Sequence, residues 1–342
     1  MRTFDILKDQ YIIGKDVVDL EVIFIDDGSS DNSGEIIQEF VKEYPNVSYY
    51  RQENQGPHIA RNLGILKSRG EYIVFWDSDD AYTANAIQIL IEAAEKYNAE
   101  IVRGGFNLCN EDELNKWRIF NNDTIISPIE ESGTEFIIRN KGLHYIGNVW
   151  GTIYKRSYLI DNEIFFDKRI RYYEDYAYNW LILVDTKKVV SIKNIVYLWA
   201  QRKGSLCHTG NISHRILNEV ESSEQSSVFM RELWMKCGKR NGFPEEILHM
   251  MIRGSYWSCF KHLGSLIKFR CLAKKEIGPK IRQLKGAGIY PLPHIFPKDL
   301  PEGYPTSLRY RVMWRLMSYE WILKLMLRLR TRKVPLNLPN KK

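Results

Sequence analysis

The chain has 342 residues, of which 44% are hydrophobic and 13% aromatic, and it carries a formal net charge of +7. This composition supplies enough apolar side chains for a sizeable core and excludes fibrous and disordered proteins. The charge is uneven: residues 1–235 hold 26 Lys and Arg against 36 Asp and Glu, whereas residues 236–342 hold 23 against 6. The sequence therefore predicts an acidic region followed by a basic one, which attract different partners.

The first hundred residues alternate short apolar runs with helical periodicity, which is the pattern of a parallel sheet covered by helices. The strands at residues 21–25 and 71–76 are continuously apolar after their first residue, which predicts central strands buried on both faces. The predicted elements are, in chain order, strand Glu21–Ile25, helix Asp31–Tyr44, strand Val47–Tyr50, helix Pro57–Arg69, strand Glu71–Trp76, helix Ala84–Tyr97 and strand Glu100–Val102.

Further along the chain the pattern is mixed and then mainly helical. The predicted fold class is α/β: a Rossmann-like, mostly parallel sheet flanked by helices over residues 1–212, then a helical basic region over residues 213–342. The elements expected in this part are an apolar helix at Tyr173–Val184, strands at Val189–Ile192 and Ile195–Trp199, and a proline-rich linker at Pro291–Pro305.

The cysteines and the chain termini carry no targeting or zinc-binding pattern. The five cysteines are odd in number and widely spaced, without a C-x-x-C pair, so neither a disulfide framework nor a zinc site is indicated. The N-terminus lacks the apolar stretch of a signal peptide, and no run of 18 apolar residues occurs. We expect a cytoplasmic protein whose membrane contact is at most peripheral.

Two acidic clusters directly follow predicted strands: Asp26–Asp31 (DDGSSD) and Asp77–Asp80 (DSDD). Because ligands of open α/β sheets bind beyond the carboxyl ends of the strands, we expect both clusters to face one crevice. One such cluster alone is equally consistent with a turn capped by Asp or Ser. Two together favour Mg²⁺ or Mn²⁺, bound with a phosphorylated ligand, because a cation would offset the repulsion among their carboxylates.

The phosphate of such a ligand needs a second binding group. No Gly-x-Gly-x-x-Gly follows the first strand and no Walker lysine motif occurs, which disfavours dinucleotide oxidoreductases and P-loop ATPases. The helix that begins at Pro57 instead places Arg61 and Asn62 within two turns of its N-terminus, where an anion is stabilised. A plain surface arginine is the alternative interpretation of Arg61.

Three motifs in this order and spacing resemble the bacterial family 2 glycosyltransferases with the GT-A fold: DDGSSDNS from Asp26, ENQGPHIARNLGI from Glu53 and GEYIVFWDSDD from Gly70. The resemblance covers approximately residues 20–205. It implies an enzyme of the EC 2.4 type, a hexosyl- or N-acetylhexosaminyltransferase of capsule, exopolysaccharide or lipopolysaccharide synthesis. It further implies a UDP-sugar donor and Mn²⁺ or Mg²⁺ as the cofactor.

The resemblance assigns roles to residues of these motifs. It implies that Asp27 recognises the uracil and that Asp77 and Asp79 contact the ribose and the metal. Arg61, with the neighbouring Asn62, is implied to lie near the sugar diphosphate.

A later segment, YLWAQRKGS from Tyr197, resembles the family loop that closes over the diphosphate. This implies that Arg202 and Ser205 contact the nucleotide-sugar. Asp80 and His208 are further candidate metal ligands, although a lone histidine after a flexible loop more often faces solvent.

The segment from Arg171 to Asp175 resembles the ED motif of the family, in which the Asp is the catalytic base and Glu174 precedes it. Independently of the family, Asp175 is at the head of a predicted helix, where the helix dipole favours a carboxylate. An ordinary capping acid is the alternative. If Asp175 faces the crevice, it can accept the proton of an attacking hydroxyl, which contributes roughly 10²–10⁴-fold to the rate. Attack opposite the leaving group would invert the anomeric configuration.

The N-terminal region departs from the family pattern. Family members begin with a strand ending in P-x-Y-N and a helix, whereas only twenty residues precede Glu21. We expect the first strand to be missing or atypical, with residues 4–10 as the remnant of the helix or residues 11–13 as an edge strand. This departure leaves open an inactive homologue that acts as a scaffold subunit in polysaccharide assembly. The clustered carboxylates leave open a second alternative, a metal-dependent nucleotidyltransferase. The second does not account for the ED motif.

Residues 306–342 hold ten Lys and Arg and a single acid, Glu320, interleaved with Trp, Met, Leu and Ile. This pattern predicts that residues 306–333 associate with an anionic membrane surface, which suits a lipid-linked or polysaccharide acceptor at the inner face of the cell membrane. A helix that packs on the rest of the protein is the alternative, because the apolar stripe is not clean. Nucleic-acid binding is disfavoured, since no nucleic-acid-binding motif accompanies the charge.

Overall fold

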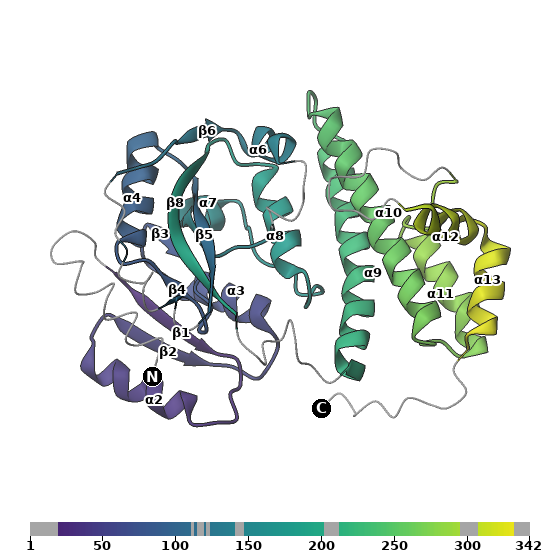
Figure 1. The fold of residues 1–342 in the computed structure, drawn as a ribbon, viewed down its shortest axis with the longest axis horizontal. Coiled ribbons are helices and arrows are strands. Elements are labelled where there is room, and N and C mark those ends of the chain that lie inside the picture. Colours follow the sequence, from purple (N-terminus) through teal and green to yellow (C-terminus); the bar gives the residue numbers. More distant parts are fainter. Residues whose placement is uncertain are drawn as a thin grey trace. The chain divides into compact units, whose positions relative to one another are not determined.

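The computed structural model describes residues 20–110, 113–114, 120, 124–140, 147–201, 212–294 and 307–331. Figure 1 shows that the chain forms two compact units. The first comprises Met1–Asn140 and Tyr145–Thr209, and the second comprises Lys141–His144 and Gly210–Lys342.

The first unit begins with a β-α-β-α arrangement. Strand β1 (Val22–Asp26) pairs in parallel with β2 (Val47–Arg51), and their register places Asp26 opposite Arg51. Helix α2 (Ser33–Glu43) connects the two strands and packs on β2, and helix α3 (Pro57–Lys67) packs on β1. Pro57 is the first residue of α3, where its fixed φ and missing N–H cost nothing.

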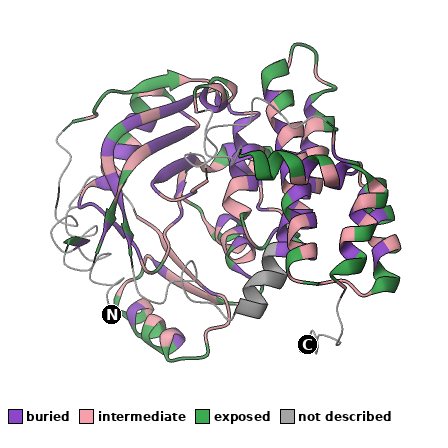
Figure 2. Ribbon diagram, turned by 45° about the vertical axis from the view of Figure 1, so that its right-hand side comes forward, coloured by how far each residue is buried: buried purple, intermediate pink, exposed green. Residues whose placement is uncertain are grey.

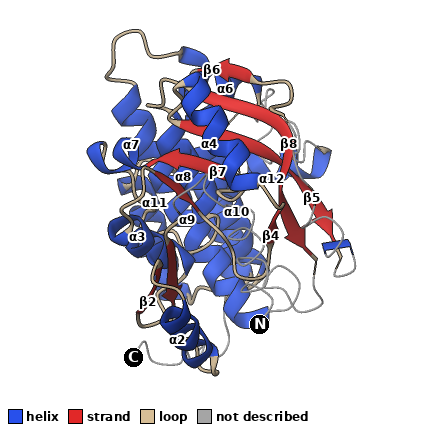
Figure 3. Cartoon of the chain, turned by 90° about the vertical axis from the view of Figure 1, so that its left-hand side faces the viewer, coloured by secondary structure: helices blue, strands red, loops and turns tan. Residues whose placement is uncertain are grey.

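Within the described residues, the main sheet has six strands; Figure 3 draws them, like the other strands, in red. Its strand order is β3 (Tyr72–Val74), β7 (Thr152–Lys155), β5 (Ile101–Cys109), β8 (Val189–Ala200) and β4 (Ala81–Tyr82), with β6 (Ile129–Glu131) beside β8. Only β5 and β8 are parallel among these pairs; the other described pairs are antiparallel. Gly104 lets β5 and β8 approach closely, because a Cβ at this position would lie 2.4 Å from the Val196 side chain.

The sheet confirms the α/β class but corrects its details. The prediction of a mostly parallel sheet is wrong for the described strands, since β1–β2 and β5–β8 are the two parallel pairs among them. The prediction of central strands is also wrong there: β1 pairs with β2 alone and β3 with β7 alone. Strand β3 lies at the edge of the main sheet because β7, about fifty residues beyond β5, runs antiparallel between β3 and β5. The expected irregularity before Glu21 lies outside the described residues.

Helices cover the main sheet, and buried side chains line its strands (Figure 2). Helix α4 (Ala86–Tyr97) packs on β5, β7 and β8, and its apolar face includes Leu90 and Ala93. The remaining helices of the unit are α6 (Gly133–Arg139), α7 (Arg156–Asp161) and α8 (Glu174–Leu183). The two strands predicted between residues 189 and 199 form one strand, β8, whose pairing with β5 is irregular at Gly105.

The second unit is helical in its described part, as the sequence predicts. Its apolar core includes Trp257, Leu263, Ile281, Trp314 and Leu327, all nearly inaccessible to solvent. None of the described helices is both long enough and apolar enough to span a membrane. The helices are α9 (Ile212–Cys237), α10 (Glu245–Lys268), α11 (Lys274–Gly286), α12 (Leu308–Ser318) and α13 (Glu320–Leu329).

Candidate active site

The first acidic cluster organises the loop that leads into α3. The Asp27 carboxylate accepts hydrogen bonds from Gln52 Nε2 and from the backbone N–H groups of Gln55 and Gly56, each at 2.8 Å. Gly56 has φ +99°, a conformation that favours glycine. Asp27 therefore fixes the start of α3, and the contact with uracil that the family resemblance implies stays a prediction.

The neighbouring Asp26 is buried and faces β2. Its carboxylate accepts hydrogen bonds from the Tyr49 hydroxyl and the Ser29 N–H, both at 2.7 Å. Burial raises the pKa of Asp26, but these hydrogen bonds and the charge of Arg51 outweigh it, so that the pKa lies below its usual value. Asp26 thus holds β1, β2 and the DDGS turn together.

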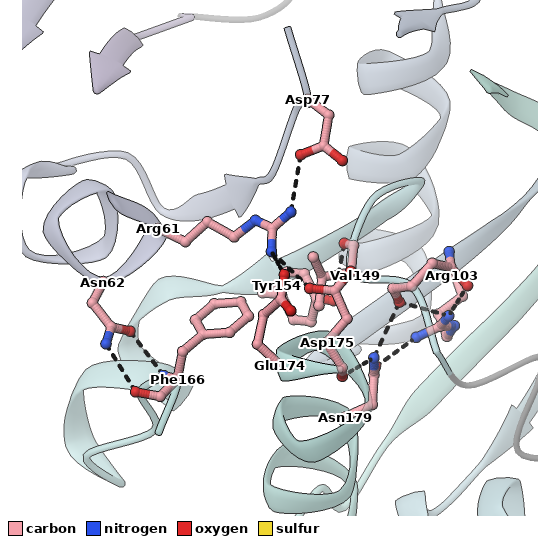
Figure 4. A network of polar contacts seen from close by, with 11 residues as sticks. Arg61, Asn62, Asp77, Arg103, Val149, Tyr154, Phe166, Glu174, Asp175 and Asn179 are labelled. Atoms are coloured by element: carbon pink, nitrogen blue, oxygen red, sulfur yellow. Dashed lines mark hydrogen bonds and ion pairs between the residues drawn. The ribbon is translucent and has the colours of Figure 1, made fainter. Parts of the chain in front are cut away.

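The Arg61 side chain joins three of the predicted site residues, which come from separate parts of the chain (Figure 4). Its Nη1 lies 2.7 Å from Asp175 Oδ1 and 3.2 Å from Glu174 Oε1, and its Nη2 lies 3.0 Å from Asp77 Oδ1. The Arg61 side chain is only 13% exposed. Burial lowers the pKa of Arg61, but the three carboxylates raise it by more, so the guanidinium stays charged. The plain surface arginine is thereby excluded.

Asp175 has the ionisation behaviour of a general base at neutral pH. Burial raises its pKa to about 7, with Arg61 opposing the rise and the charges of Glu174 and Asp77 adding to it. Burial also raises the pKa of Glu174. Both residues begin α8, and Tyr173 precedes them in a left-handed conformation with φ +62°. A base whose pKa lies near the working pH transfers protons most efficiently.

Asp80 is turned toward β8 rather than toward Arg61. It is 4% exposed, and its two carboxylate oxygens accept hydrogen bonds from the Tyr197 hydroxyl at 2.7 Å and the Ala200 N–H at 2.8 Å. Burial raises the pKa of Asp80 to about 6. Asp80 thus anchors the loop after β3 to β8, and both of its carboxylate oxygens are engaged by the protein.

Asn62 faces away from the ion pairs of Arg61, although the two residues are adjacent. Its side-chain amide donates to the Phe166 carbonyl at 2.9 Å and accepts from the Phe166 N–H at 2.8 Å (Figure 4). Both polar groups of this buried amide are therefore engaged by the backbone of a neighbouring segment. We assign Asn62 a structural role in place of the ligand contact that the sequence predicts.

Three predicted residues, Arg202, Ser205 and His208, lie outside the described residues. Within the described part, no group of three or more His, Cys, Asp or Glu side chains is arranged to hold a metal ion. Mg²⁺ and Mn²⁺ need no such group, because they are commonly held by one or two carboxylates and substrate phosphates. Among the described residues, three carboxylates converge on Arg61, so the site offers the oxygen ligands that a divalent cation prefers.

A second layer of residues around Asp175 is not among those that the sequence motifs indicate. The buried side chains of Arg103 and Asn179 lie beside it (Figure 4), and both form hydrogen bonds to the partly buried Asn148. A usable signal was present for Arg103, because a charged residue interrupts the otherwise apolar and glycine-rich run IVRGGF of β5. Nothing in the sequence pattern distinguishes the two asparagines.

Comparisons with known proteins agree with this site. Residues 2–160 match the model of Glycosyl transferase family 2. The chain is 30% identical over 196 residues to the uncharacterized glycosyltransferase EpsJ of Bacillus subtilis, which covers 55% of this chain and 54% of the relative. It is 29% identical over 204 residues to the glycosyltransferase GlyG of Streptococcus pneumoniae, which covers 58% and 67%. The matches thus span roughly half to two thirds of these relatives.

The fold is that of TarS from Staphylococcus aureus. The structure of TarS residues 1–349 in complex with UDP-GlcNAc matches with a TM-score of 0.59 over 97% of this chain and 89% of that one, at 15% identity. The same TarS segment in complex with UDP matches with a TM-score of 0.56 over 92% and 86%, at 14% identity. Residues 2–160 thus resemble glycosyltransferase family 2, and the chain as a whole shares the GT-A fold of TarS.

Proposed function

We propose that the protein is an inverting, metal-dependent glycosyltransferase that moves a sugar from a UDP-sugar to a hydroxyl of a lipid-linked or surface polysaccharide acceptor. The observation that carries the proposal is the convergence of Asp77, Glu174 and Asp175 on Arg61. This brings the acidic loop after β3, the N-terminal part of α3 and the first turn of α8 to one point. The names of the curated relatives and the UDP-GlcNAc bound to TarS support the choice of reaction and donor.

In this proposal Asp175 accepts the proton of the acceptor hydroxyl while the oxygen attacks the anomeric carbon. The bond from that carbon to the diphosphate breaks on the opposite side, so the configuration is inverted. Arg61 keeps the Asp175 carboxylate oriented through Nη1, which Glu174 also contacts, and Asp77 holds Nη2 of the same guanidinium. Arg61 and Arg202 are the proposed cations that stabilise the negative charge of the departing diphosphate.

Asp77 and Asp79 would hold Mn²⁺ or Mg²⁺ together with the diphosphate, and the cation would supply positive charge to the leaving group. Asp80 supports this arrangement indirectly, because its bonds to Tyr197 and Ala200 fix the loop that carries both acids. Asp27 fixes the neighbouring loop and is the proposed contact for the uracil. In each acidic cluster, then, one aspartate holds the loop and another is proposed to face the ligand. Asp26 and Asp80 hold the loops, and Asp27 and Asp77 are proposed to face the ligand.

The proposal is tested by Mn²⁺-dependent release of UDP from a panel of UDP-sugars. The variants are Asp175→Asn, Asp79→Ala and, as a matched control, Asp161→Asn at the exposed end of α7. We expect the first two to lose at least about 100-fold in rate and the control to keep the wild-type rate. A wild-type protein that binds neither UDP nor Mn²⁺ would overturn the proposal and favour the scaffold subunit.

We also propose that the second unit binds the anionic inner face of a cell membrane, where a lipid-linked acceptor is found. On α13, Trp321, Leu325 and Leu329 are 67%, 49% and 75% exposed and follow each other at intervals of four residues, so they form one stripe. Leu323 and Leu327 of the same helix are buried in the core. The helix therefore packs on the core with one face and presents a second apolar face to solvent. The apolar residues of α13 thus belong to two separate faces, of which the exposed one supports the proposed membrane contact.

Basic side chains accompany this stripe and give it the charge that anionic lipids require. The exposed arginines of α12, α13 and the residue after it are Arg309, Arg311, Arg315, Arg328 and Arg330. Glu320, the acid of this segment, is paired with Lys285 and Lys324. Exposed apolar side chains together with exposed arginines are typical of helices that lie in a membrane interface.

A further inference from the structure

We propose that Arg103 is a positioning residue for Asp175: it holds the backbone at residues 148–149 against the Asp175 carboxylate and, through Asn179, the first turn of α8. The inference rests on the proposed role of Asp175 as the base. It adds a residue that neither the sequence motifs nor the ion pairs of Arg61 include.

The position of Arg103 is unusual for a charged residue. It lies within β5, opposite Thr152 of β7, and is 8% exposed. Burying a guanidinium costs free energy unless its donors are satisfied in good geometry. Burial lowers the pKa of Arg103, and the negative charge of Asp175 is among the groups that oppose this. The charge of Arg103 therefore acts on the site as well as on its direct partners.

The donors of Arg103 reach two asparagines. Its Nη1 donates to Asn179 Oδ1 at 2.9 Å, and its Nη2 donates to the Asn148 carbonyl at 3.1 Å and to Asn148 Oδ1 at 3.2 Å. The planar guanidinium thus bridges a loop residue and a helix residue in one fixed geometry, which an ammonium group cannot reproduce. Figure 4 shows this fork next to Asp175.

Two short routes connect these partners to the base. The residue after Asn148 is Val149, whose backbone N–H donates a hydrogen bond to the Asp175 carboxylate, and whose carbonyl accepts from the Tyr154 hydroxyl at 3.1 Å. Asn179 donates through Nδ2 to the Asp175 carbonyl at 2.8 Å and to the Asn148 carbonyl at 3.1 Å. Loss of the fork would thus loosen the N–H that stabilises the ionised base and the helix turn that carries it.

The network also predicts how replacing Arg103 changes the pKa of Asp175, and with it the pH dependence of the rate. A looser Val149 N–H stabilises the ionised carboxylate less, so the pKa of Asp175 rises when Arg103 is replaced. Arg103→Lys keeps a charge and loses the fork, whereas Arg103→Met loses both, so the shift is larger for Met. The other charged or titratable groups that face Asp175 stay the same in both variants: Arg61 of α3, Asp77 after β3, Glu174 of α8 and Tyr154 of β7.

The chain supplies a matched control for these variants. Arg139 of α6 lies over the Phe136 ring at 5.4 Å, and Arg103 lies over the same ring at 5.6 Å. Arg139 bonds to Glu131 and Ser191 and has no described bond to the Asp175 network. Arg139→Lys therefore disturbs the same aromatic neighbour without touching the base.

The test measures kcat, the KM for the UDP-sugar and the pH profile of folded full-length variants, and it titrates the Asp175 carboxyl by carbon NMR. We expect Arg103→Lys to lower kcat about tenfold, to change KM less than twofold, and to move the Asp175 titration to higher pH. Arg139→Lys should change none of these. In the Asp175→Asn background, Arg103→Lys should cost nothing further, because both changes act on one group.

The outcomes separate the two proposals. Wild-type activity of Asp175→Asn would refute the base, while the NMR titration would still report whether Arg103 positions the carboxyl. A wild-type titration and wild-type kcat in Arg103→Lys would overturn the role of Arg103, as would equal losses in the Asp and Asn backgrounds. If Arg103→Lys does not fold, Asn148→Ala breaks the same route from the other side, and an unshifted titration there would overturn the inference.

Discussion

Arg61 Nη1 and Asp175 Oδ1 lie 2.7 Å apart although 114 residues separate them in the sequence. Their ion pair joins the motif at the start of α3 to the motif at the start of α8. The same guanidinium reaches Asp77, so a single cation organises the proposed base and the proposed donor-binding acid. The predictions below follow from this arrangement and from the surfaces around it.

Replacement of Arg61 is expected to raise the pKa of Asp175. In Arg61→Met the positive charge that opposes the raised pKa of Asp175 is lost, so that pKa rises further above its wild-type value of about 7. At neutral pH the base is then mostly protonated, and the rate of UDP-sugar consumption falls. Arg61→Lys should retain part of the rate, because it keeps the charge but reaches fewer carboxylates. Equal losses in both variants at every pH would contradict this account.

The wild-type enzyme should gain activity as the pH rises through about 7. The proposed base works when it is ionised, and the ionised fraction of Asp175 falls as the pH drops below its raised pKa. Below that value kcat should fall about tenfold for each pH unit, and above pH 8 it should level off. Steady-state rates between pH 5 and 9 measure this. If kcat stayed constant between pH 5 and 8, the rate would not depend on the ionisation of Asp175, and its role as the base would be contradicted.

Asn62→Ala should destabilise the protein and leave donor binding intact. The substitution leaves the Phe166 N–H and carbonyl without their buried partner, which costs about 1–3 kcal/mol of unfolding free energy. Urea unfolding measures the loss, and the KM for the UDP-sugar of the folded protein should stay within twofold. Weaker donor binding without a loss of stability would return Asn62 to the ligand site.

The stripe on α13 should decide membrane binding. Full-length protein is expected to float with vesicles that contain phosphatidylglycerol and not with pure phosphatidylcholine, and Trp321 fluorescence should shift to the blue on binding. Leu325→Ser with Leu329→Ser should weaken binding at least about tenfold, because two apolar side chains no longer enter the interface. Leu66→Ser on α3 removes an equally exposed leucine from the first unit and serves as the control.

Unchanged flotation of the double variant would refute the stripe as the membrane contact. Binding to both lipid compositions alike would refute the part assigned to the arginines. Self-association of the wild type, lost in the double variant without any vesicle binding, would instead assign the stripe to an interface between two copies of the chain.

Between residues 21 and 100, the local sequence by itself determined the helices, the strands β1, β2 and β3 and the motifs at their ends, but not the two-residue strand β4. Apolar periodicity depends on neighbouring residues, so α2, α3 and α4 lie within two residues of their predicted bounds at each end. Apolar periodicity does not predict which strands pair with one another. The insertion of β7 between β3 and β5 involves residues about fifty positions apart for β5 and about eighty for β3, and only the tertiary structure decided it.

The same limit applies to the site. Adjacent residues of α3 point about 100° apart, so Arg61 meets the carboxylates while Asn62 bonds to Phe166. Within the DSDD cluster, Asp77 reaches Arg61 and Asp80 reaches Tyr197. A motif names the chemistry that a segment offers. Which of its side chains faces the ligand is decided by the elements packed around it, and these come from distant parts of the chain.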